Sequence, residues 1–138
     1  MDNQELIQKA LDARENAYAP YSHYAVGAAV LTKDGLVYTG CNIENASYGA
    51  TNCAERTAIF KAVSEGHKEF TKIAIVGGKK GQEPDDYAYP CGVCRQVVAE
   101  FCNTEEMTVI VAKSVDDYIE KKLCELLPLH FGGNIWNI

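Results

Sequence analysis

The sequence lacks any apolar run long enough to cross a membrane. Its longest apolar stretches, such as Ala25 to Leu31, fall far short of the roughly 20 residues that a spanning helix needs. The first residues also lack the basic segment and following apolar core that mark a secretion signal. From these absences we expect no membrane partner and a cytoplasmic location.

Positive charge is also scarce. The chain has 13 Lys and Arg against 19 Asp and Glu, a net charge of −6, and the basic residues form no cluster. Because binding to DNA or RNA depends largely on Lys and Arg that neutralise phosphates, this balance argues against a nucleic-acid partner and against a polynucleotide-editing enzyme.

The length and composition are those of one ordinary domain. The 138 residues are 47% hydrophobic and 23% charged, without repeats, which predicts a single domain over residues 1–138. Apolar periodicity predicts helices at about 3–18, 53–64, 91–101 and 122–127, and strands at 24–32, 36–41, 72–76 and 108–112. Residues 42–52 and 77–89 are expected to be loops. This order predicts an α/β fold in three layers, α/β/α, with a mixed sheet of about five strands.

Cysteine is the residue type that carries the most information. In a chain without an export signal, metal binding or catalysis is a better interpretation of cysteines than disulfides. Cys91 and Cys94 form a C-x-x-C at one expected helix start, and Cys53 lies at another. Helix N-termini favour the thiolate form, and thiolates bind zinc well. Three such ligands leave a fourth tetrahedral position for water, as a catalytic zinc requires.

Charged residues adjoin this predicted metal site. Glu55 lies two residues after Cys53, where it is poorly suited as a fourth ligand but could take a proton from the activated water and pass it to a substrate. Zinc with three thiolates carries a net charge of −1, which weakens a Lewis acid. We therefore expect at least one of Arg56 and Arg95, with Arg56 preferred, to donate to the sulfurs and balance this charge.

Alternatives remain open from the residues alone. The cysteines could hold a closed structural zinc with a fourth ligand from Cys41, Cys102 or Cys124, in a zinc-stabilised binding module rather than an enzyme. The adjacent Cys-Ala-Glu favours catalysis, because a structural site needs no carboxylate there. Asn42 and Glu44 could be turn and cap residues or could contact a ligand.

The motif Cys53-Ala54-Glu55 followed by Pro90-Cys91-x-x-Cys94 resembles the signature of zinc deaminases. Nearly the whole chain is similar to the small homotetrameric cytidine deaminases. The segments that carry this further resemblance are Tyr18-Ala19-Pro20-Tyr21-Ser22, Val26-Gly27-Ala28-Ala29, Gly40-Cys41-Asn42-Ile43-Glu44-Asn45-Ala46, Cys53-Ala54-Glu55-Arg56-Thr57-Ala58, Pro90-Cys91-Gly92-Val93-Cys94-Arg95-Gln96 and Glu125-Leu126-Leu127-Pro128.

The resemblance implies a cytidine deaminase-like fold and a reaction. Free cytidine and deoxycytidine would be hydrolysed to uridine and deoxyuridine with release of ammonia, as in pyrimidine salvage. Zinc on Cys53, Cys91 and Cys94 would activate a water that attacks C4 of the base. Glu55 would carry protons from that water to N3 and to the leaving ammonia.

The resemblance also implies substrate contacts and an assembly. Asn42 and Glu44 would bind the ribose hydroxyls, and further substrate contacts would come from Tyr24, Ala54, Tyr48 and Phe131. Tyr48 and Phe131 would act across subunit boundaries in a homotetramer. The tail 132–138 and the longer loop 78–89 depart from the family pattern. These departures leave substrate preference and subunit contacts open, including a cytosine-bearing antibiotic nucleoside as the substrate.

Overall fold

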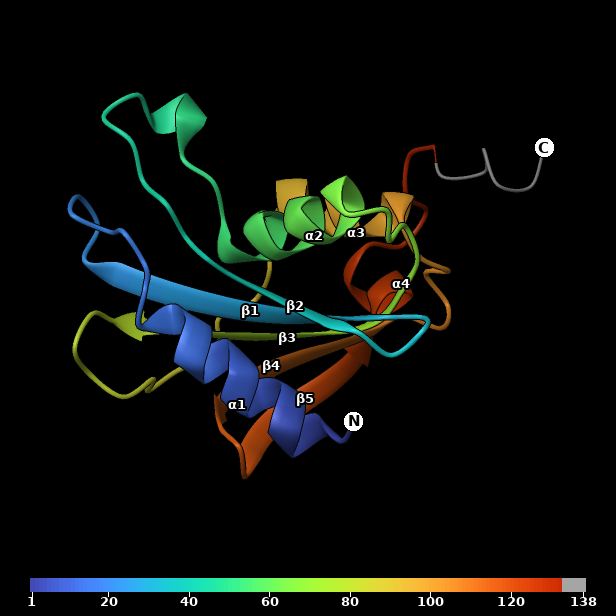
Figure 1. The fold of residues 1–138 in the computed structure, drawn as a ribbon, viewed down its shortest axis with the longest axis horizontal. Coiled ribbons are helices and arrows are strands. Elements are labelled where there is room, and N and C mark those ends of the chain that lie inside the picture. The colour runs from blue at the N-terminus through green and yellow to red at the C-terminus, as the bar shows by residue number, and fades with distance from the viewer. Residues whose placement is uncertain (133–138) are drawn as a thin grey trace.

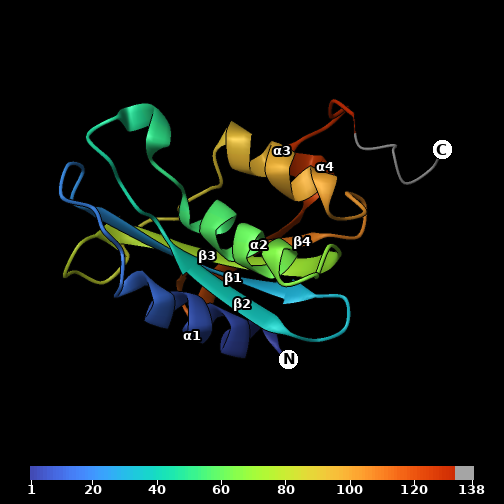
Figure 2. The ribbon, with the colours of Figure 1, turned by 45° about the horizontal axis from the view of Figure 1, so that its top comes forward.

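A five-stranded mixed sheet separates two layers of helices in the computed structural model, which describes residues 1–132 (Figures 1 and 2). The strand order is β2-β1-β3-β4-β5, and every neighbouring pair is antiparallel except β3 and β4. The strands are β1 Tyr24–Thr32, β2 Val37–Cys41, β3 Phe70–Lys79, β4 Thr108–Ser114 and β5 Asp117–Lys122. The helices are α1 Asn3–Arg14, α2 Ala54–Ser64, α3 Gly92–Glu100 and α4 Leu123–Leu126, with a 3-10 turn η1 at Tyr48–Ala50. The predicted α/β fold is confirmed.

Alternating side chains of the central strands supply two separate cores. Helix α1 covers one face of the sheet, and α2, α3 and α4 cover the other (Figure 1). Along β1, Ala28 and Val30 pack toward α2, whereas Ala29 packs toward α1. The strand period of two therefore places successive residues in different layers.

Two glycines let the helices approach the sheet closely. A Cβ at Gly27 in β1 would lie 2.0 Å from the carbonyl oxygen of Ala10 in α1, and a Cβ at Gly40 in β2 would lie 2.5 Å from the amide nitrogen of Ala58 in α2. Any side chain at either position would push a helix off the sheet.

Two predicted elements have clearly different bounds in the structure, and one strand lies where the sequence predicted none. The first helix ends at Arg14, not near Tyr18, because the amide of Tyr18 donates to the carbonyl of Asn42 and so joins the loop after β2. Strand β3 extends to Lys79 through two glycines that the sequence analysis placed in a loop. Strand β5, which had not been located, contains mostly polar residues because it lies at the sheet edge.

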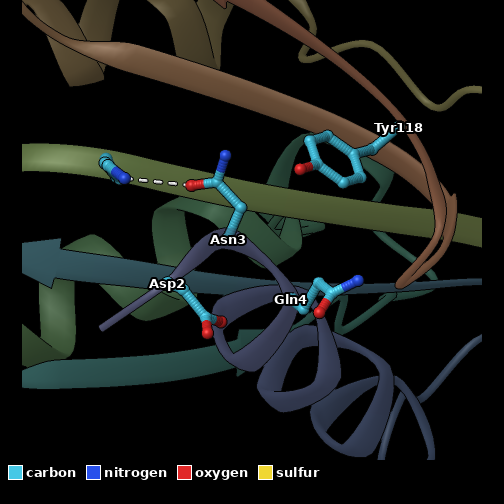
Figure 3. Close-up of a pocket in the computed structure, with 5 residues that line it drawn as sticks. Asp2, Asn3, Gln4 and Tyr118 are labelled. Atoms are coloured by element: carbon cyan, nitrogen blue, oxygen red, sulfur yellow. Dashed lines mark hydrogen bonds between the residues drawn. The ribbon is translucent and has the colours of Figure 1, made fainter.

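A cavity of about 390 Å³ lies at the start of α1, on the sheet face that α1 covers (Figure 3). It is lined by Asp2, Asn3, Gln4, Lys72 and Tyr118. Lys72 Nζ donates to Asn3 Oδ1 over 2.9 Å, so the ammonium already has a partner. The cavity contains none of the predicted site residues. Within residues 1–132, no helix has the length and apolar character needed to cross a membrane.

Candidate metal centre and active site

The three predicted cysteine ligands come together at the starts of two helices. Cys53 is the N-cap of α2, Cys91 is the N-cap of α3, and Cys94 lies in the first turn of α3. Their sulfurs all lie within 4.8 Å of one another. This cluster contains none of Cys41, Cys102 and Cys124, so the described residues offer no cysteine as the fourth ligand of a closed structural site.

The cluster has the dimensions of a tetrahedral zinc site. At a zinc–sulfur distance of about 2.3 Å, two sulfurs on adjacent vertices are about 3.8 Å apart. The sulfurs of Cys53 and Cys91 are 3.8 Å apart. The donor set and its spacing therefore fit zinc.

The pKa values of Cys53 and Cys94 are shifted in opposite directions. A hydrogen bond from the thiol of Cys94 lowers the pKa of Cys53 to about 5, against the opposing effect of burial. The same bond and burial raise the pKa of Cys94. Arg56 Nη2 also donates to Cys53 Sγ, over 3.4 Å. The proposed charge-balancing contact is thus present for Arg56.

Arg95 does not contact the sulfurs. Its Nε donates to the carbonyl of Pro90 over 2.8 Å, and its Nη1 donates to the carbonyl of Leu126 over 3.0 Å. Arg95 therefore ties the start of α3 to α4. Of the two arginines considered for charge balance, only Arg56 has the geometry for it.

Glu55 is a buried carboxyl group in the first turn of α2, beside Cys53. Only 4% of its surface is exposed. Burial is the main cause that raises the pKa of Glu55 to about 7, although a hydrogen bond from its own backbone amide acts in the opposite direction. Near neutral pH such a group can both accept and donate a proton, which is the property that general acid–base chemistry needs. Ala54, beside it, is fully buried as the first residue of α2.

Asn42 is held rigidly by the backbone of β1. Its Oδ1 accepts from the amide of Val26 over 2.9 Å, and its Nδ2 donates to the carbonyl of Tyr24 over 2.8 Å. An amide side chain has two donor hydrogens and two acceptor lone pairs, so one of each remains for a ligand. Asn42 does not act as a turn or cap residue, because its side-chain hydrogen bonds reach across to β1 and not to neighbouring residues in sequence.

Glu44 holds the loop before β1. Its Oε1 accepts from the amides of Tyr21 and Ser22 over 3.0 and 3.1 Å, and the hydroxyl of Ser22 donates to Oε2. The Ser22 hydroxyl is the main cause that lowers the pKa of Glu44. A carboxylate offers about four lone-pair positions, so about one is left for a further donor. Sequence reasoning missed the contribution of Ser22, although Ser22 lies within a segment that it singled out.

The aromatic candidates differ in their surroundings. The ring of Tyr24 lies over Gly77, where a Cβ would be 3.0 Å from Tyr24 Cε1, and the side chain is 39% exposed. Tyr48 in η1 is 77% exposed, and its ring meets that of Tyr21 edge-on. Phe131 is 87% exposed, and its carbonyl accepts from Gln96. The described contacts join neither Tyr48 nor Phe131 to the cysteine cluster of the same chain.

Together, the fold and the site define the class of protein: a metalloenzyme whose metal activates water. Three sulfurs at two helix starts, with a buried carboxyl group in the first turn of one helix, form a metal centre suited to activating water. Its layered α/β scaffold places an open polar loop, residues 42–52, directly before the first of these helices (Figure 2).

Comparisons with known proteins agree with this class. Residues 1–111 match the family described as the cytidine and deoxycytidylate deaminase zinc-binding region. The cytidine deaminase of Halalkalibacterium halodurans is 53% identical over 99% of both chains. The crystal structure of cytidine deaminase from Burkholderia pseudomallei has a TM-score of 0.85 and 45% identity, covering 95% of this chain and all of the other. Blasticidin-S deaminase of Bacillus cereus is 31% identical, over 94% of this chain and 92% of its own length. The chain belongs to the zinc-binding cytidine and deoxycytidylate deaminase family, and zinc is its cofactor.

Proposed function

We propose that this protein hydrolyses the exocyclic amine of free cytidine and deoxycytidine, giving uridine or deoxyuridine and ammonia. The observation that carries the proposal is the Cys53, Cys91 and Cys94 cluster with the buried carboxyl group of Glu55 beside it. The 53% identity to a cytidine deaminase over nearly the full length supports the choice of substrate.

Each residue of the cluster has a proposed task. Cys53, Cys91 and Cys94 hold the zinc ion, and Arg56 reduces the negative charge on Cys53. Zinc supplies Lewis acidity, which lowers the pKa of a coordinated water from about 9 toward 7. Glu55 would take one proton from the attacking water and deliver it to N3 of the base as the new C–O bond forms at C4. It would then take the second proton, from the hydroxyl group on C4, and give it to the amino group, so that the C4–N bond breaks and ammonia leaves.

The sugar is bound on the side of the loop after β2. Asn42 and Glu44 each keep part of their hydrogen-bonding capacity, which suits ribose or deoxyribose hydroxyls. Tyr24 packs beside the base, and the resemblance to cytidine deaminases assigns a further substrate contact to Ala54, the buried first residue of α2.

We further propose a homotetramer with sites at subunit boundaries. Tyr48 and Phe131 are large aromatic residues that lie mostly exposed on the single chain, as residues do that become covered by a partner. In this assembly they contribute to a neighbour's site. Pyrimidine salvage in the cytoplasm is the proposed setting.

A cytosine-bearing antibiotic nucleoside is the second candidate substrate, favoured by the 31% identity to a blasticidin-S deaminase. The higher identity to a cytidine deaminase favours cytidine. Turnover of cytidine, deoxycytidine, cytosine and blasticidin S by the same preparation ranks these substrates directly. Faster turnover of blasticidin S than of cytidine would replace the first proposal with the second.

The substitution Glu55→Gln tests catalysis against a zinc-stabilised binding module. A deaminase should keep its zinc and its fold but lose turnover by about 10² to 10⁴. The measurements are metal content, circular dichroism and the loss of ultraviolet absorbance when cytidine is converted. An unmodified protein that binds zinc and cytidine but releases no ammonia would be a binding module.

A further inference from the structure

We propose that Arg14 is a positioning residue for sugar binding, which acts from the back of the sheet on the segment of β1 that orients Asn42. The inference rests on the proposed function, because that function assigns the sugar hydroxyls to Asn42. Arg14 itself lies on the α1 side and has no contact with the cysteine cluster in the part of the chain that the structure describes.

Arg14 bridges the ends of two neighbouring strands. Its Nε donates to the carbonyl of Ala25 in β1 over 2.9 Å, and its Nη2 donates to the carbonyl of Lys79 in β3 over 2.7 Å. The side chain is only 6% exposed. A planar guanidinium can satisfy two carbonyls at once in fixed directions, and charged donors make shorter, stronger bonds than neutral ones.

The sequence leaves space for this side chain. A Cβ at Gly78 would lie 3.2 Å from Arg14 Nη2, and a Cβ at Gly27 would lie 2.7 Å from the amide nitrogen of Arg14. Both glycines lie on the sheet face that α1 covers. The guanidinium therefore occupies a slot built from the backbones of β1 and β3.

The charge of Arg14 has no carboxylate partner among residues 1–132, although burying a charge is costly without compensation. Compensation comes from the two carbonyl dipoles and from the C-terminal end of α1, whose last turn contains Arg14. Because the described side-chain bonds of Arg14 go only to backbone carbonyls, the guanidinium ties the start of β1 to the end of β3.

The fixed segment is the one that holds Asn42. Ala25, whose carbonyl Arg14 holds, lies between Tyr24 and Val26, and these two residues supply the backbone groups that bond the Asn42 amide. The backbone N–H of Asn42 also donates to the carbonyl of Val26, over 3.2 Å. A shift of β1 at Ala25 therefore moves both bonding partners of the Asn42 side chain together. Because hydrogen bonds weaken steeply with misalignment, such a shift weakens sugar binding specifically.

The test compares ligands with and without sugar hydroxyls. In Arg14→Met, which keeps the length of the side chain but has no donors, the inhibition constant of uridine should rise about tenfold, as for loss of one well-placed hydrogen bond. The constant for 2′,3′-dideoxyuridine should change by less than about threefold. The KM for cytidine should rise by a similar factor to the inhibition constant of uridine, while kcat stays near that of the unmodified protein. The matched control is Lys61→Met, which removes an exposed side-chain bond to the carbonyl of Thr39 and should change neither constant.

A double-mutant cycle with Asn42→Ala tests the route. If Arg14 acts through Asn42, Arg14→Met should have no further effect on uridine binding in the Asn42→Ala background. If Arg14→Met does not fold, Arg14→Lys replaces it, with a smaller effect of the same selectivity because Lys lacks the planar fork.

Two outcomes overturn the inference alone: equal weakening of uridine and dideoxyuridine, or unchanged uridine binding in the variant that folds. If Asn42→Ala leaves uridine binding unchanged, the proposed sugar contact is wrong, and the role of Arg14 is rejected with it. Failure of the proposed function has a different signature, because the unmodified protein would then release no ammonia from cytidine.

Discussion

Arg56 donates from Nη2 to the sulfur of Cys53 over 3.4 Å, within the first turn of α2. This contact places a permanent positive charge beside a cluster that would otherwise carry excess negative charge. We therefore expect Arg56→Gln to lower zinc affinity or turnover by about 10- to 100-fold, as is usual when a group that supports a metal ligand is lost. Zinc titration against a competing chelator and the rate of cytidine deamination measure the two effects.

The matched control is Arg95→Gln. Arg95 also follows a cysteine directly in sequence, but it donates only to the carbonyls of Pro90 and Leu126. Arg95→Gln should lower the thermal stability of the protein and leave its zinc affinity near that of the unmodified protein. Unchanged zinc affinity and turnover in Arg56→Gln would show that the charge of Arg56 does not matter to the metal centre.

Removal of zinc should change the reactivity of particular cysteines. Bound zinc protects its thiolate ligands, so chelation should make Cys53 and Cys91 react with iodoacetamide, and Cys91 is exposed. Cys102 provides the internal control, because burial raises the pKa of its thiol to about 12 and keeps it slow in both states. Peptide mass spectrometry before and after chelation gives the site-by-site rates. Equal labelling of Cys53 and Cys91 with and without zinc would contradict the assigned ligands.

The pH response of Glu44 should depend on Ser22. The Ser22 hydroxyl is the main cause that lowers the pKa of Glu44 below its ordinary 4.5. A carboxyl group with a depressed pKa stabilises the fold above its unfolded pKa, and this contribution is lost as the pH falls through the folded value. Ser22→Ala should therefore move the titration of Glu44 to higher pH.

Carbon-13 NMR of the side-chain carboxyl groups, with Glu44→Gln for assignment, measures this midpoint. Ser64→Ala is the control, because the Ser64 hydroxyl bonds only the carbonyl of Lys61 on the exposed face of α2. Identical midpoints in Ser22→Ala and the unmodified protein would mean that the hydroxyl does not hold the carboxylate.

The metal cluster was predictable because Cys53-Ala54-Glu55 with Pro90-Cys91-x-x-Cys94 forms a recognisable motif, although Cys53 and Cys91 are 38 residues apart. Two helix starts, each marked by a cysteine, fix where the sulfurs point once the helices form, and Cys53 and Cys91 are both N-caps as expected. Arg14 carried no such signal: its partners, Ala25 and Lys79, are respectively 11 and 65 residues away in sequence. Contacts of this kind exist only after the strands pair.

The end of β3 and the whole of β5 differ from the sequence prediction for a shared physical reason, which is strand pairing. Gly77 and Gly78 were interpreted as loop residues, yet they continue β3 by pairing with β1. Both positions are glycine because the ring of Tyr24 and the guanidinium of Arg14 occupy the space that a side chain would fill. The polar strand at Asp117–Lys122 is stabilised by pairing with β4 and not by burial of an apolar face. Local pattern could not report either contribution.

Shared active sites can be tested by combining two defective subunits. Phe131→Ala alone should lower turnover about tenfold or more if its ring stacks in a neighbour's site, and Glu55→Gln alone should be nearly inactive. In a mixed oligomer, the Phe131→Ala subunit supplies Glu55 while the Glu55→Gln subunit supplies Phe131, so some sites are restored. Co-expression with two different tags and purification on both isolates the mixed species, whose turnover should exceed the mean of the two parents.

The control for this experiment pairs Glu55→Gln with Cys53→Ala. Both residues belong to the same helix start of one chain, so mixing these subunits creates no intact site and should restore nothing. Recovery in both mixtures would indicate an artefact of association. Absence of recovery in the first mixture, or an active monomer by light scattering, would place Phe131 outside its neighbour's site. The exposed ring of Phe131 would then have no part in catalysis, and each chain would carry a complete active site of its own.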